Sequence, residues 1–337
     1  MSEVSIKMAD IFGTANNDLL FGTPDDDVIN ALEGNDDVVS AGDGNDTVIA
    51  GSGEDNVFGG DGDDRVEGEV GTDFIRGWTG NDFLDGGAGT DILSGEDGND
   101  ILVGGEGNDL LFGDIDDVTG IGNDVLFGGS GDDKITGGQG NDLIFGSQDR
   151  DILSGSLGDD FVSGGEDHDL VFGAAGNDSV FGDGGNDSLN GGSDNDLVNG
   201  GDGLDTLTGT STLSPMPGLG EVDVLTGNEA NDVFVLGQVL PDGTKSVFYD
   251  DGDPNNAGTT DYALITDLGI EGDEDKIQLV GETSDYSLGA SPDNLSPGTA
   301  IFFNDGASPE LIAIVAGVSS DELNLDNSNQ FILMANP

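Results

Sequence analysis

A nine-residue repeat constrains this chain more than any other feature. The stretch GGEGNDLLF, residues 104–112, carries glycine at positions 1, 2 and 4, aspartate at position 6 and leucine at position 8. The same frame recurs between residues 13 and 235 and places 23 aspartates in register, with Leu, Ile, Val or Phe at position 8 of every unit. A short unit repeated at a fixed period predicts a stack in which each repeat contacts its neighbours.

The residue types within the repeat predict its local structure. The first six residues form a glycine-rich turn, because glycine suits positive φ and close backbone approach. The last three form a short strand, in which position 8 faces the opposite side from positions 7 and 9. One inward residue per short strand gives a thin core, so we expect bound ions to provide much of the stability.

The charge of the chain limits its partners. Seventy Asp and Glu residues face seven Lys and Arg, for a formal net charge of −63. A surface this acidic repels nucleic acid and anionic lipid, and the longest apolar runs are too short for a membrane span. High charge alone would indicate disorder, but the regular phase of the aspartates argues against it. Cations are the expected ligands.

Calcium fits the available donors best. It takes six to eight oxygen ligands, carboxylate and carbonyl, in tolerant geometry, whereas Mg²⁺ demands a strict octahedron and retains water. Zinc prefers His and Cys, and the chain has no cysteine and one histidine, His168, in a repeat turn. That histidine lies outside any HExxH motif, and a Ser-His-Asp triad would depend on it alone. We therefore expect no enzymatic activity.

The repeat resembles the G-G-x-G-x-D-x-U-x nonapeptide of the RTX calcium-binding family. This resemblance implies an all-β fold, a parallel β-roll that forms a right-handed solenoid with two nonapeptides per turn. The repeats here would make about 12 turns, followed by a C-terminal β-rich cap. In that family each ion lies between successive turns and is bridged by aspartates two repeats apart.

Applied to this chain, the resemblance separates the position-6 aspartates into two columns that bind up to about 20 Ca²⁺ ions. The glycines of the repeat, represented by Gly104, Gly107, Gly137 and Gly140, would expose the carbonyl ligands. The first column is Asp18, Asp36, Asp55, Asp73, Asp91, Asp109, Asp133, Asp151, Asp169, Asp187, Asp205 and Asp223. The second column is Asp27, Asp46, Asp64, Asp82, Asp100, Asp124, Asp142, Asp160, Asp178, Asp196 and, after a gap, Asp232.

The pattern divides the chain into three parts. Residues 1–12 are expected to cap the N-terminal strand edge, residues 13–235 to form the calcium-binding roll, and residues 236–337 to form a β-rich cap that includes a secretion signal. A six-residue insertion at about 113–119 should loop out without breaking the stack. The degenerate repeat 209–217, GTSTLSPMP, keeps the length of one slot but carries prolines where a strand is needed. We expect it to fill that slot as a bulged loop and to weaken two ion sites. The C-terminal segment contains Asp267, Asp273 and Asp275. We interpret these three residues as surface acids, and the alternative is that they bind one further ion.

One outward face is apolar. Position 7 of alternate strands reads Phe83, Ile101, Val125, Leu143 and Phe161, and position 9 adds Val103, Phe127 and Phe145. A continuous apolar patch of several hundred Å² indicates an interaction surface. One interpretation is contact with a second copy or with the C-terminal segment, and the other is shielding by neighbouring turns.

These observations favour a secreted calcium-binding protein that folds on Ca²⁺ outside the cell and has a structural or adhesive role at the surface. The N-terminus lacks the basic start and apolar stretch of a signal peptide. We therefore expect an extracellular or cell-surface location reached through type I secretion machinery, as the resemblance implies. The alternative is a Ca²⁺-dependent carbohydrate- or ice-binding adhesin module, and a third option is a non-catalytic fragment of an RTX toxin or enzyme.

Overall fold

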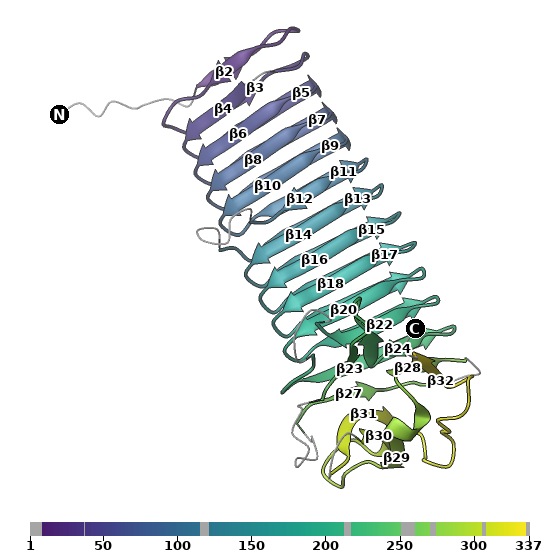
Figure 1. The fold of residues 1–337 in the computed structure, drawn as a ribbon. Helices are drawn as coiled ribbons and strands as arrows, with labels where there is room; N and C mark the ends of the chain where they lie inside the picture. The colour runs from purple at the N-terminus through teal and green to yellow at the C-terminus, as the bar shows by residue number, and fades with distance from the viewer. Residues whose placement is uncertain are drawn as a thin grey trace, which may run out of the picture. The chain divides into compact units, whose positions relative to one another are not determined.

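The computed structural model describes residues 9–36, 38–114, 121–211, 217–250, 260–269, 274–304 and 308–334 (Figure 1). The fold is all-β, a parallel β-solenoid of about 11 turns, close to the expected number. No α-helix occurs among the described residues, so none of them forms a helix that could span a membrane. The chain forms two compact units, Met1–Phe161 and Val162–Pro337.

The first unit consists of two parallel sheets whose strands alternate along the chain, as Figure 1 shows. One sheet contains β1 (Asp10–Phe12), β3 (Val28–Asn30), β5 (Thr47–Gly53), β7 (Arg65–Gly71), β9 (Phe83–Gly89), β11 (Ile101–Glu106), β13 (Val125–Ser130) and β15 (Leu143–Gln148). The other contains β2 (Leu19–Phe21), β4 (Val38–Asp43), β6 (Asn56–Asp61), β8 (Phe74–Thr79), β10 (Ile92–Asp97), β12 (Leu110–Phe112), β14 (Lys134–Gln139) and β16 (Ile152–Leu157).

Most strands are longer than the three residues that the repeat predicted. A typical strand, such as β11, continues through positions 1 to 3 of the next repeat, where Gly105 pairs with Gly87 and Gly129 of adjacent turns. Gly105 has a φ of 111°, which turns the chain while its ladder pairing continues. The prediction treated the glycines as turn alone, whereas stacking identical turns lets the backbone pair there too.

Position 8 forms the core, as predicted. Apart from the half-buried Leu20 of the first repeat, its side chains are buried, for example Leu102, Leu126 and Ile144. Each meets its equivalent in the next turn, since the register joins Leu102 to Leu126 and Leu126 to Ile144. Each sheet thus contributes one row of buried apolar residues to the interior.

The second unit continues the two-sheet pattern. Strand β17 (Phe161–Glu166) begins at the last residue of the first unit. One sheet contains β19 (Ser179–Gly184), β21 (Leu197–Asp202), β23 (Val222–Glu229), β27 (Tyr262–Ile265), β31 (Glu310–Ala316), β30 (Gly298–Phe303) and β29 (Tyr286–Ala290). The other contains β18 (Leu170–Ala175), β20 (Ser188–Ser193), β22 (Thr206–Thr210), β24 (Val233–Val235), β28 (Lys276–Val280) and β32 (Phe331–Met334).

Parallel pairing extends past residue 235. Strand β27 pairs with β23, and β28 pairs with β24, both in parallel. The sheet then turns antiparallel from β31 to β30 and β29, over a cluster formed by Tyr262, Ala300, Leu311 and Ile314. A hairpin of β25 (Gly237–Val239) and β26 (Lys245–Val247) and the 3₁₀ turn η2 (Thr283–Asp285) complete the unit. The division between roll and cap at residue 235 stays a prediction.

The two irregular repeats behave differently from each other. The stack continues across the six-residue insertion, since Ile101 pairs with Val125 in the same register as Phe83 with Ile101. Of the insertion, residues 115–119 lie outside the described residues. The degenerate repeat does not fill a slot, so that prediction was wrong. Strand β22 ends at Thr210, residues 217–220 form turns, and β23 pairs directly with β21.

Candidate metal centres

The position-6 aspartates are buried and linked along each column. Most are 0–3% exposed. One carboxylate oxygen, Oδ1, accepts the backbone N–H of the aspartate one turn earlier: Asp64 donates to Asp82 at 2.7 Å, and Asp82 to Asp100 at 2.8 Å. The same bond, 2.8 Å long, joins Asp100 to Asp124 across the insertion. The structure therefore aligns the candidate ligands as the sequence predicted.

The order of the columns changes after the degenerate repeat, which corrects the prediction. The Asp196 N–H donates to Asp223, and the Asp205 N–H donates to Asp232, each at 2.9 Å. Asp223 thus belongs to the second column and Asp232 to the first, the reverse of the assignment from sequence. The reason is that β23 pairs directly with β21, so nine additional residues lie between β22 and β23 and every later repeat is shifted by one half-turn of the solenoid.

The other carboxylate oxygen, Oδ2, is buried without a hydrogen-bond donor in most members of both columns. Buried polar atoms are normally paired, because an unpaired group loses its water without compensation. A row of such oxygens fits a row of cations. The aspartates concerned include Asp46, Asp55, Asp64, Asp73, Asp82, Asp91, Asp100, Asp109, Asp124, Asp133, Asp142, Asp187, Asp196, Asp205 and Asp232.

A position-1 glycine leaves space beside most of these oxygens, whereas position 1 is Ala41 before Asp46 and Ala50 before Asp55. A Cβ atom built on Gly104 would lie 2.5 Å from Oδ2 of Asp109 and 2.6 Å from the carbonyl oxygen of Gly128, in the next turn. Gly137 has the same surroundings, with Asp142 and the Gly155 carbonyl. Two oxygens at these distances form a cradle of a size that suits Ca²⁺, whose ligands lie at about 2.3–2.6 Å. Calcium there would supply positive charge that neutralises the carboxylate.

The position-4 glycines have a different role. Gly107 and Gly140 adopt φ values of 128° and 125°, a region that disfavours other residues. A Cβ on either would collide with a backbone carbonyl of the preceding turn. These glycines therefore permit the turns to stack closely. Among the described residues, no three His, Cys, Asp or Glu side chains gather as a metal site.

Burial disfavours the charged form of these aspartates. It raises the pKa of Asp64 and Asp142 to about 7 and that of Asp100 and Asp124 to about 8, and carboxylates of adjacent turns add to the rise. The backbone N–H donors oppose it. Rows of carboxylates in this environment are costly to ionise without a cation.

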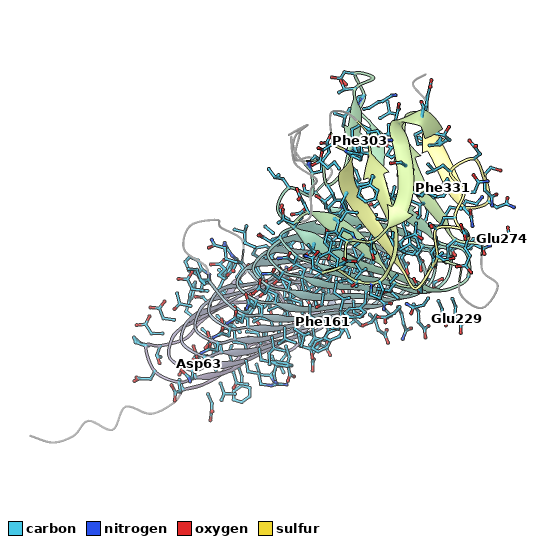
Figure 2. All side chains as sticks on the ribbon, turned by 90° about the horizontal axis from the view of Figure 1, so that it is seen from below. Asp63, Phe161, Glu229, Glu274, Phe303 and Phe331 are labelled. Atoms are coloured by element: carbon cyan, nitrogen blue, oxygen red, sulfur yellow. The ribbon has the colours of Figure 1, made fainter. Side chains whose placement is uncertain are left out.

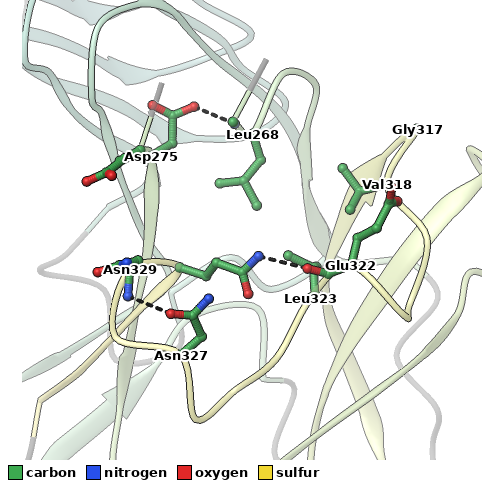
Figure 3. A pocket seen from close by; sticks show the side chains of 11 residues that line it. Leu268, Asp275, Gly317, Val318, Glu322, Leu323, Asn327 and Asn329 are labelled. Carbon is green, nitrogen blue, oxygen red and sulfur yellow. Dashed lines mark hydrogen bonds between the residues drawn. The ribbon is translucent and has the colours of Figure 1, made fainter. Parts of the chain in front are cut away.

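The sequence reasoning undervalued Asp275, which extends the first column. Its Oδ1 accepts the Asp232 N–H at 2.9 Å, and its Oδ2 accepts the Gly269 N–H at 2.8 Å. Figure 3 shows Asp275 beside a polar cavity of about 490 Å³, also lined by Leu323 and Asn329. The repeat motif does not reach residue 275, so only the parallel pairing of β28 reveals this position. Asp267 accepts the N–H groups of Gly227 and Asn228, and Asp273 lies outside the described residues.

His168 has a structural environment. Its Nδ1 accepts the Asn186 N–H at 2.8 Å, the bond that Asn side chains make elsewhere at position 5, as between Asn99 and Asn81. The histidine therefore replaces an asparagine in an exposed ladder.

The apolar outward residues line up as predicted. The register joins Phe83, Ile101, Val125 and Leu143 on consecutive turns, and the rings of Phe127 and Phe145 stack at 5.2 Å. Figure 2 shows the side chains that project from the ribbon, with Phe161 labelled. The Phe161 ring lies 5.7 Å from that of Phe145. Exposure is partial, 41% for Ile101 and 36% for Phe127.

Glycine-rich turns, aspartate columns and one inward aliphatic residue per strand define a parallel β-roll built for cations. Models of the RTX calcium-binding nonapeptide repeat match residues 12–41, 36–66, 58–93, 85–117, 118–153, 145–180 and 181–211. The chain belongs to this RTX calcium-binding repeat family, and it is a Ca²⁺-binding repeat protein whose roll is of a typically non-catalytic kind. No curated protein matches the chain significantly.

Proposed function

We propose that this protein is secreted, folds when calcium binds outside the cell, and acts there as a structural or adhesive surface component. The observation that carries the proposal is the row of buried Oδ2 atoms without donors. A ligand that binds the folded state alone stabilises that state in proportion to the logarithm of its concentration. Extracellular calcium modules bind at roughly 10⁻⁴–10⁻³ M, so the chain would remain unfolded where free calcium is scarce.

The proposal assigns the aspartates of both columns as ligands, with carbonyls exposed by the position-1 glycines. It also assigns the segment 236–337 a part in export through type I secretion machinery. The high acidity supports this function, because the seventy Asp and Glu residues keep the unloaded chain expanded.

Export can be tested by expressing the chain with a type I exporter and measuring its distribution between cells and medium. We expect the full chain in the medium or on the cell surface, in a form that resists protease when calcium is present. Deleting residues 236–337 should retain the chain inside the cell. Full retention of the intact chain in the cytoplasm would contradict the proposed location.

We also propose that the apolar outward face joins two copies of the protein. Stacked aromatic rings and partly exposed aliphatic side chains support this contact. Substituting both Leu143→Glu and Phe145→Glu should convert a dimer to a monomer in analytical ultracentrifugation, because like charges would face each other across the contact. The control is Ile152→Glu, a 42% exposed position on the other sheet. An unchanged mass for the double variant would count against this face.

A further inference from the structure

The ends of the aspartate columns differ from their interior. In the interior members named above, Oδ2 has no donor. At the ends, Oδ2 accepts a hydrogen bond from the protein itself. The donors are the Thr14 N–H to Asp18 at 2.6 Å, the Thr23 N–H to Asp27 at 2.5 Å, the Gly269 N–H to Asp275 at 2.8 Å and the Tyr249 hydroxyl to Asp223 at 2.5 Å.

The bond from Tyr249 stands out because a side chain from outside the repeats provides it. Both Tyr249 and Asp223 are completely buried. A Cβ built on Gly209 would touch Oδ2 of Asp223 and the Tyr249 hydroxyl. A Cβ atom built on Gly104 would instead touch Oδ2 of Asp109 and the Gly128 carbonyl of the next turn. The tyrosine hydroxyl therefore takes the place that the next-turn carbonyl has in other turns, and it closes the cradle by donating to Oδ2 of Asp223.

Several contacts hold Tyr249 in this position. Its backbone N–H donates to the Pro217 carbonyl at 2.7 Å, which connects it to the last residue of the degenerate repeat. Its ring packs where a side chain on Gly218 would be, and Gly218 has a φ of 82°. Tyr249 itself has a φ of 62°, a conformation that is unfavourable for an aromatic residue and needs support from its surroundings.

We propose that the Tyr249 hydroxyl takes the place of a calcium ion at the end of the second column, so that Asp223 closes this column and binds no ion through its Oδ2. This inference rests on the proposed calcium binding by the interior aspartates. A hydroxyl donor satisfies the terminal carboxylate oxygen without a cation. The last ion of the second column is then held at Asp196, whose cradle includes the Gly209 carbonyl at 2.5 Å from the Gly191 Cβ position.

The first test counts bound calcium per chain by equilibrium dialysis and atomic emission. We expect Asp223→Asn to bind as many ions as the wild type. The matched control is Asp205→Asn in the same unit, because Asp205 is equally buried and its Oδ2 has no donor. The control should bind at least one ion fewer. Loss of an ion from Asp223→Asn equal to that of the control would overturn the inference.

The second test measures thermal stability in saturating calcium. Tyr249→Phe removes the hydroxyl, keeps the ring and leaves a buried carboxylate oxygen without a donor, so we expect the midpoint to fall by roughly 3–6 °C. Its calcium count should stay that of the wild type. The control Tyr286→Phe removes a buried hydroxyl that donates to the Val280 carbonyl at 2.7 Å, and we expect a smaller fall. Equal falls for the two variants would refute a special role for Tyr249.

The two proposals fail in different ways. If the wild type binds no calcium and Asp205→Asn matches it, the calcium function itself is wrong. If the wild type binds calcium and Asp205→Asn loses an ion, the function stands, and the behaviour of Asp223→Asn and Tyr249→Phe then decides the closure of the second column.

Discussion

Removal of calcium with excess chelator is expected to convert the far-ultraviolet circular dichroism spectrum of this protein from β-sheet to largely disordered. The aliphatic core has one residue per strand, such as Leu84 or Leu102, and cannot offset the conformational entropy of the glycine-rich turns. Carboxylates stacked one turn apart would also repel each other without cations. Returning calcium should restore the β spectrum in a cooperative transition.

The control for this experiment is magnesium at the same concentration and ionic strength. Magnesium should restore little structure, because it demands octahedral geometry and holds its waters, whereas simple screening of charge would make both ions equally effective. A spectrum that is the same before and after chelation would contradict the calcium-dependent fold.

Gly104→Ala is the single substitution with the largest expected effect. The new methyl group would occupy the cradle between Asp109 and the Gly128 carbonyl, and backbone cannot move aside as a flexible side chain could. Overpacking costs about 1–3 kcal/mol, and loss of an ion present at about 100 times its Kd removes about 2.7 kcal/mol more. We expect a loss of about 4–6 kcal/mol in the free energy of unfolding in calcium, and at least one ion fewer per chain.

Gly184→Ala is the matched control for that variant. Gly184 likewise belongs to a solenoid strand, as the last residue of β19, but a Cβ there would meet only the Gly165 carbonyl, at 3.8 Å, which is ordinary contact. Its stability and calcium count should remain close to those of the wild type. If Gly104→Ala proved as stable as Gly184→Ala, the cradle would not be an ion site.

Most of the roll can be predicted from the sequence, because the period and residue types of the repeat determine where its turns, strands and buried positions lie. The phase of the aspartates gives the columns as far as Asp205, and position 8 gives the core, as Leu126 and Ile144 show. Sequence could not decide whether the degenerate repeat fills a slot or leaves the stack, since both keep its length at nine residues. Its two prolines were read as a bulge within a slot, whereas β23 pairs with β21 without it.

The ends of the columns were beyond sequence reasoning for a different reason. Tyr249 follows Asp223 by 26 residues and belongs to no motif. Asp275 lies 43 residues after Asp232, yet takes the same hydrogen bond as an aspartate 18 residues away in a regular repeat. Contacts of this kind depend on how the C-terminal strands return to the roll, which periodicity does not encode.

The nine additional residues between β22 and β23 have a consequence for how such chains can diversify. The six-residue insertion preserves which sheet each later repeat joins, because Asp124 follows Asp100 as it would without it. Nine additional residues instead exchange the two sheets for every later strand of the roll, as Asp223 and Asp232 show. A single insertion of this length moves all later outward side chains to the opposite surface of the roll without any substitution among them. Gain or loss of an odd number of repeats can therefore change the outer surface of such a protein while its ion-binding interior is kept.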